Sequence, residues 1–122
     1  MESCSCCGPV TMLLPCSGGS NVGQISNEIA RLLTLDNKGV MFCLAGIGGD
    51  IEPMLDRVKS AERVLAIDGC PVACAKKTLE RHDIAHEWLE LTSLGIDKCP
   101  DLELNPEVVA CALKAAEETL KA

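Results

Sequence analysis

Strand-length segments alternate with segments of helical periodicity along most of this chain. The strand-length segments cover residues 10–14, 40–45, 62–68 and, with only partial alternation of apolar and polar residues, 86–91. After each of them, apolar residues recur three and four positions apart, as they do on one face of an amphipathic helix. Strands that alternate with helices of this length are typical of βαβ units, in which the strands lie parallel.

The alternation predicts a single α/β domain over residues 10–122. Right-handed crossovers between parallel strands place helices on both faces of the sheet. We therefore expect a three-layer αβα sandwich with a mostly parallel four-stranded sheet, which is a Rossmann-like arrangement. A chain of 122 residues is long enough to bury such a core without disulfide bonds. Residues 1–9 are small, polar and Cys-rich, and we expect them to form a flexible tail.

Capping residues and prolines indicate where the helices begin. Asn21 precedes the first helical segment and is followed three residues later by Gln24, which predicts a cap at Asn21. Proline suits the first turn of a helix, so Pro71 predicts a helix start directly after the third strand. Asn105 and Pro106 predict the cap and first residue of the last helix in the same way.

Charge and hydropathy exclude several classes of partner. The chain has 18 acidic and 11 basic residues, for a formal net charge of −7, so neither nucleic-acid phosphates nor an anionic membrane surface is an expected partner. No apolar run approaches the roughly 18 residues that span a bilayer. The first residues lack the basic and hydrophobic regions of a secretory signal, so we expect a cytoplasmic protein.

Cysteine is the unusual feature of the composition, with nine among 122 residues. In the predicted sheet, Cys16 follows the first strand, Cys43 lies within the second, Cys70 follows the third, and Cys74 comes four residues later. The carboxyl ends of parallel strands share one edge, where open α/β sheets bind ligands. We therefore expect these cysteines, far apart in the chain, to lie near a single crevice.

Thiols at such an edge indicate metal binding. Cysteine in a cytosolic chain points to a metal or a reactive thiol more often than to a disulfide. Soft thiolate ligands suit Zn²⁺, Cu(I) or an iron–sulfur cluster, and a closed zinc site takes four sulfurs at about 2.3 Å from the ion. Because Cys70 and Cys74 are four residues apart, they are expected to be neighbours on one helix face and able to share an ion.

The individual cysteines also have plainer interpretations. A single cysteine is often a small buried hydrophobe, which suits Cys43 and, above all, Cys111. Cys99 is expected to be a surface thiol or, alternatively, to close over the crevice. Cysteines of the tail form either a soft-metal chelator or part of an unstructured end; they are Cys4, Cys6 and Cys7.

Cys70 has the strongest case for reactivity. At a predicted helix N-terminus it meets unpaired backbone N–H groups and the positive end of the helix dipole, which favour its thiolate. Gly69 permits the sharp turn before it. Asp68 is expected to be a partner that orients the ligands, a hard oxygen ligand, or a carboxylate that caps the helix.

Other polar motifs give weaker indications. The glycine-rich segments 17–21 and 46–49 match neither a P-loop nor a complete G-x-G-x-x-G, so tight turns are expected there rather than a nucleotide site. Their backbone can approach a metal or an anion closely. His82 and His86 are separated by a predicted helix end, and we expect both to be ordinary surface residues.

Three of these segments resemble the DGC-domain family of small prokaryotic proteins, which are described as zinc-binding. The matching segments are 15–25, 43–49 and 68–74, and the resemblance covers about residues 10–120. It implies four metal-binding cysteines, which fall on Cys16, Cys43, Cys70 and Cys74. The tail cysteines and the two further ones at 99 and 111 are not part of this pattern, so the choice of the four thiolates stays open.

These observations leave three functional hypotheses. The leading one is a cytoplasmic protein that binds Zn²⁺, or alternatively an iron–sulfur cluster, through thiolates at the carboxyl edge of the sheet. The second is a thiol-based redox, sulfur-transfer or metalloid-handling enzyme with Cys70 as nucleophile and Cys74 or Cys16 as resolving thiol, although the Cys-x-x-x-Cys spacing departs from that of thioredoxin. The third is a metal carrier or interaction module, in which the tail passes the ion to a protein partner that the sequence does not identify.

Overall fold

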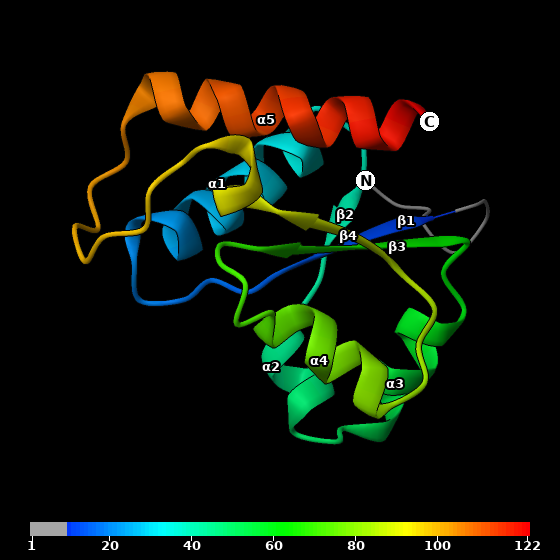
Figure 1. Ribbon diagram of the computed structural model, residues 1–122. Helices are drawn as coiled ribbons and strands as arrows, with labels where there is room; N and C mark the ends of the chain where they lie inside the picture. The colour runs from blue at the N-terminus through cyan, green and yellow to red at the C-terminus, as the bar shows by residue number, and fades with distance from the viewer. Residues whose placement is uncertain (1–9) are drawn as a thin grey trace.

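The computed structural model describes residues 10–122, and the tail predicted for residues 1–9 lies outside them. The described part of the chain is an α/β domain built around a four-stranded sheet (Figure 1). In chain order its elements are β1 (Thr11–Pro15), α1 (Asn21–Leu35), β2 (Val40–Met41), α2 (Leu44–Gly48), α3 (Glu52–Lys59), β3 (Arg63–Asp68), α4 (Cys74–Arg81), β4 (Glu87–Glu90), the 3₁₀ turn η2 (Leu91–Leu94) and α5 (Pro106–Lys121).

All neighbouring strands of the sheet are parallel, in the order β2-β1-β3-β4. Leu13 of β1 pairs with Leu65 of β3, which in turn pairs with Glu87 of β4. Helices α1 and α5 cover one face, and α2, α3 and α4 cover the other (Figure 1). The predicted α/β fold and three-layer sandwich are therefore confirmed.

Each face of the sheet carries its own apolar core. Leu13 packs with residues of α1 and α5, whereas its neighbours Met12 and Leu14 pack on the opposite face with residues of α2 and α4. All three side chains are at most 2% exposed. A strand that is buried on both faces reads as a continuous apolar run, which is why β1 and β3 were recognisable in the sequence.

The strand order creates a crevice at the carboxyl ends of β1 and β3. The chain leaves β1 toward α1 on one face, but it leaves β3 toward α4 on the other face (Figure 1). Between two such strands the connections diverge, and ligands of open α/β sheets bind at this point. Residues that directly follow Pro15 and Asp68 therefore line the crevice.

Three predicted boundaries were wrong. Strand β2 has only two residues instead of covering 40–45, because it is an edge strand and the short helix α2 follows at once with Cys43 as its N-cap. The cap of α1 is Ser20, whose hydroxyl accepts from the N–H of Gly23 at 3.1 Å, and not Asn21. Helix α4 begins at Cys74 rather than at Pro71.

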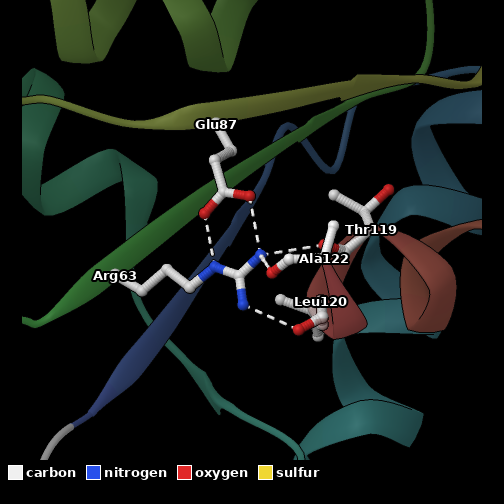
Figure 2. A network of polar contacts seen from close by, with 5 residues as sticks. All are labelled: Arg63, Glu87, Thr119, Leu120 and Ala122. Carbon is white, nitrogen blue, oxygen red and sulfur yellow. Dashed lines mark hydrogen bonds and ion pairs between the residues drawn. The ribbon is translucent and has the colours of Figure 1, made fainter.

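An arginine network fixes α5 at the opposite, amino end of the sheet (Figure 2). The guanidinium of Arg63 donates two hydrogen bonds to the carboxylate of Glu87, and donates to the carbonyl oxygens of Thr119 and Leu120 at 2.8 and 2.7 Å. The hydrogen bond from Arg63 lowers the pKa of Glu87. Basic groups at a helix C-terminus also oppose the negative end of its dipole.

Within residues 10–122, no helix combines the length and the apolar composition needed to cross a bilayer.

Candidate functional site

Cys16 is held in a fixed position at the end of β1. Its N–H donates to the carbonyl of Ile67 at 2.9 Å, which continues the pairing of β1 with β3. Its Sγ lies 3.4 Å from the Oγ of Ser26, and the N–H of Gly69 donates to the same sulfur at 3.4 Å. Ser26 is fully buried in α1, and its hydroxyl also donates to the carbonyl of Gly23 at 2.6 Å. Two different segments therefore position this thiol.

Glycines let those segments come close enough to touch. A Cβ atom on Gly69 would lie 2.6 Å from the carbonyl carbon of Val22 and 2.7 Å from the backbone nitrogen of Gly23. A Cβ on Gly23 would in turn lie 2.3 Å from the carbonyl oxygen of Gly18. The turn after β3 thus rests directly on the first turn of α1, which brings Cys70 near the loop that carries Cys16.

The carboxylate of Asp68 caps α4. The residue is 1% exposed, and its carboxylate accepts three hydrogen bonds: from the N–H of Ala75 at 2.8 Å, from the N–H of Lys76 at 3.0 Å, and from the indole of Trp88 at 2.9 Å. Both oxygens are occupied by these donors. Of the three roles expected for Asp68, the structure supports the cap.

This cap also explains the position of Cys70. The chain makes a turn at 69–73, in which Ala73 has a left-handed backbone with φ of 62°, and the helix starts only at Cys74. Cys70 therefore lies in the turn, and the expectation that it shares a helix face with Cys74 was wrong. The expectation that Cys70 meets the free N–H groups of the helix N-terminus was wrong as well. Cys74 occupies the first helical position, and the carboxylate of Asp68 accepts from the N–H groups of the next two residues.

A lysine that the sequence reasoning missed contacts Cys70. The ammonium of Lys98 donates to the Sγ of Cys70 at 3.5 Å. The segment around Lys98 is attached to the first residue of α1, since the N–H of Cys99 donates to the Oδ1 of Asn21 at 2.7 Å, and the N–H of Asn21 donates to the carbonyl of Cys99 at 3.0 Å. No local pattern marks such contacts, because the partners are 28 and 78 residues apart in the chain.

Three of the predicted site cysteines line one cavity. It has a volume of about 220 Å³ and lies in the crevice after β1 and β3. Cys16, Cys70 and Cys74 contribute to its wall, together with Lys98 and the glycine-rich loop before α1. Cys16 and Cys70 are half-buried, and Cys74 is exposed. Convergence of these segments on one rim is the arrangement expected from parallel strands.

Cys43 lies in a neighbouring hollow. This hollow has a volume of about 650 Å³ and is lined by Cys16, Cys43, Phe42 and Thr78 among others. Cys43 is exposed at the N-cap of α2, so its interpretation as a buried hydrophobe was wrong. Cys16 contributes to both cavities and is the thiol that connects them.

Comparison with known proteins identifies the family. A sequence profile of the DGC domain matches residues 12–116. This chain belongs to the DGC domain family. It is also similar to the anaerobic and virulence modulator AnvM of Pseudomonas aeruginosa, with 41% identity over 91 residues that cover 74% of this chain and 70% of AnvM. No solved structure matches it.

Within residues 10–122, the thiols of this DGC domain are not gathered around a common point. Among the residues that the structure describes, no three His, Cys, Asp or Glu side chains are arranged so that they could hold a metal ion. Cys16, Cys70 and Cys74 share a cavity, but their side chains are not arranged around one position for an ion. The exposed side chains of Cys43 and Cys74 have room to rotate.

The remaining candidates lie elsewhere in the DGC domain. Cys99 is exposed beside Lys98, and Cys111 is exposed on α5, so the expectation that Cys111 is buried was wrong. The Nε2 of His82 lies 2.9 Å from the Oδ1 of Asp50, and the Nδ1 of His86 lies 2.8 Å from the carbonyl oxygen of Ile84. The two histidines therefore have separate neighbours.

Proposed function

We propose that this DGC domain binds a soft metal ion, with Zn²⁺ as the expected one, through the thiolates of Cys16, Cys43, Cys70 and Cys74. The observation that carries the proposal is the cavity after β1 and β3, whose wall contains three of these four thiols. The fourth lies in the adjoining hollow, which Cys16 also lines. Family membership supports the proposal as well, because the matched residues 12–116 include all four cysteines.

The donor chemistry fits a soft ion better than a hard one. Thiolates prefer zinc, Cu(I) or iron–sulfur clusters over Mg²⁺ or Ca²⁺, which bind oxygen ligands. The carboxylate nearest the cavity belongs to Asp68, and both of its oxygens already accept hydrogen bonds. Bound by four thiolates, zinc would link the turns after β1 and β3 and supply folding stability.

Metal analysis of anaerobically purified, full-length protein tests this proposal. We expect about one zinc per chain and no absorption bands in the visible range. Cys70→Ser and Cys16→Ser should each lose the ion, whereas Cys111→Ser, a matched change of an exposed cysteine on α5, should keep it. Charge-transfer bands in the visible range would indicate that the site holds an iron–sulfur cluster instead of zinc. Folded protein that carries neither metal and whose thiols all titrate freely would refute the proposal.

The biological setting follows from the same chemistry. Metal-binding thiolates need to stay reduced, which suits the cytoplasm. The related protein of Pseudomonas aeruginosa is named a modulator, and a metal site whose occupancy depends on free thiols is suited to such a role. The alternative of a metal carrier requires the cysteines of residues 1–9, and deletion of that segment should then abolish transfer to a partner while the domain keeps its own ion.

A further inference from the structure

We infer that the loop 95–105, between η2 and α5, is a docking surface for a basic segment of a partner protein. A lysine or arginine of that partner enters a hollow with an apolar floor and an acidic rim, and apolar side chains of the partner cover two leucines of the loop. None of the residues that carry this inference is a proposed metal ligand, so it goes beyond the proposed function and does not depend on it.

The first observation is a hollow beneath the loop. It has a volume of about 350 Å³ and is lined by Ile25 of α1, Ile96 of the loop and Val108 of α5 among others. Ile25 is buried, and the other two are half-buried against the apolar core beneath α1 and α5. These three side chains therefore give the hollow an apolar floor.

The second observation is the charge around this floor. Asp97, Asp101 and Glu103 line the same hollow and are exposed, so they form its rim. Within residues 10–122, none of the three takes part in an ion pair. The ammonium of Lys98 contacts the sulfur of Cys70 and lines the thiol cavity instead. A cation that approaches the hollow thus meets three carboxylates that no cation of the domain neutralises.

The third observation is a pair of exposed leucines that alternate with the acidic residues. Leu102 is 56% exposed and Leu104 is 40% exposed, and neither lines the hollow, although the residues between and before them do. The loop that carries them, yellow to orange in Figure 1, runs outward at the end of the molecule where α1 and α5 begin. Exposed apolar side chains that border a hollow are typical of a surface that binds a partner.

A fixed loop favours binding to a preformed surface. Asn21 makes three hydrogen bonds to it: its N–H donates to the carbonyl of Cys99 at 3.0 Å, its Nδ2 donates to the carbonyl of Asp97 at 2.8 Å, and its Oδ1 accepts from the N–H of Cys99 at 2.7 Å. The N–H of Glu103 also donates to the Oδ1 of Asp101 at 3.0 Å. A surface that is already ordered loses less conformational entropy when a partner binds.

Charge complementarity identifies the partner as basic. Lysine and arginine combine an apolar stem with a charged head, so the stem fits the floor of this hollow and the head fits its rim. The formal net charge of −7 attracts a basic partner and repels a second copy of the chain. Charges on such a rim contribute mainly specificity and a faster association, while the apolar contacts of the leucines add affinity.

A phage-displayed library of random peptides of about twelve residues provides the probe. It is selected on immobilised full-length protein, and the Kd of the most enriched peptide is measured by fluorescence anisotropy. We expect that peptide to contain a lysine or arginine close to aliphatic residues. Norleucine or citrulline at the basic position removes the charge and should weaken binding about tenfold. Combined replacement of the rim, Asp97→Asn, Asp101→Asn and Glu103→Gln, should also weaken it about tenfold.

Two further variants separate the loop from the overall charge. Leu102→Ser with Leu104→Ser should weaken binding severalfold without a change of charge. The matched control combines Glu52→Gln, Asp56→Asn and Glu118→Gln, which remove the same three charges from exposed positions on α3 and α5. This control should change the Kd less than twofold, and circular dichroism should show native folding of every variant because all the positions are exposed.

Several outcomes would overturn the inference. They are the absence of enriched peptides, enriched peptides without a basic residue, and equal Kd changes in the rim variant and its matched control. Sedimentation velocity tests the remaining occupant of the surface. A dimer of the wild type that Leu102→Ser with Leu104→Ser abolishes would assign the loop to a second copy of the chain and would overturn the inference as well.

Discussion

Replacement of Asp68 by asparagine tests how the site is held together. The Oδ1 of Asp68 accepts one N–H, from Ala75, and its Oδ2 accepts two, from Lys76 and Trp88. Asparagine keeps one acceptor oxygen and turns the other position into a donor. If the amide oxygen of asparagine takes the place of Oδ2, its NH₂ group faces the N–H of Ala75. If the oxygen takes the place of Oδ1, the NH₂ group faces the N–H groups of Lys76 and Trp88. At least one hydrogen bond is lost in either case.

The size of the effect follows from burial. Asp68 is 1% exposed, so a donor that it leaves behind cannot turn to bulk water without a local rearrangement. An unsatisfied buried donor costs about 1–3 kcal/mol, and the bonds that remain lose the strengthening given by a charged acceptor. We expect Asp68→Asn to lower the free energy of unfolding by about 2–4 kcal/mol. Domains of this size have about 5–15 kcal/mol in total, so the loss is large.

The assay uses urea unfolding, followed by circular dichroism and by the fluorescence of Trp88, the one tryptophan of the chain. Glu80→Gln makes the same chemical change at an exposed position of α4, and should change the free energy of unfolding by less than about 0.5 kcal/mol. Both variants are measured in the presence of a chelator and, separately, with added zinc. A loss below about 0.5 kcal/mol for Asp68→Asn would refute the capping role. A loss that appears only with zinc would show that Asp68 is a metal ligand.

Three further perturbations test other parts of the fold. Gly69→Ala places a Cβ 2.6 Å from a backbone atom of α1 and should lower the free energy of unfolding in urea by about 2–3 kcal/mol. Gly19→Ala is the control and should be nearly neutral, because nothing lies within 4 Å of its Cβ position. Similar losses for both variants would contradict the argument that Gly69 allows a close approach. Ser26→Ala removes the buried hydroxyl beside Cys16 and should cost about 1–2 kcal/mol, with a changed alkylation rate at Cys16 and an unchanged one at the exposed cysteine of α5. Arg63 lowers the pKa of Glu87 from its ordinary value of 4.5, so the stabilisation by this ion pair is complete above pH 4.5 and is lost as the pH falls through the lowered pKa. Over this pH range, the midpoint temperature of thermal unfolding should therefore fall more for the wild type than for Arg63→Met.

Much of the fold was predictable because burial leaves a pattern in the sequence. The central strands are buried on both faces, and their apolar runs were found at the correct places. Edge strand β2 was predicted to begin at the correct residue but to be too long, because only Val40 and Met41 pair with β1 and the apolar residues that follow them begin a helix. Strand order depends on which helices pack on which face, and local periodicity contains no information on that.

The site was predictable only in outline. Parallel topology correctly indicated that segments after β1 and β3 meet, and this placed Cys16 and Cys70 at one cavity. The start of α4 was predicted too early, at Pro71, because proline is typical of the first turn of a helix. The helix begins at Cys74 instead, where its first N–H groups are capped by Asp68, which lies on the other side of the turn. The contact of Lys98 with Cys70 joins a loop to a turn 28 residues away and depends on the tertiary structure alone.

Charge limits how four thiolates can be gathered at this edge. The chain already has a formal net charge of −7, and a divalent ion offsets only two of the four charges of its ligands. The ammonium of Lys98 lies where part of the remaining charge would accumulate. Zinc affinity should therefore follow the charge at position 98, and it is measured by competition with a chelator at low salt. Lys98→Arg should bind zinc about as tightly as the wild type, Lys98→Gln more weakly, and Lys98→Glu most weakly. Equal affinities across this series would show that the proposed site lies beyond the reach of Lys98.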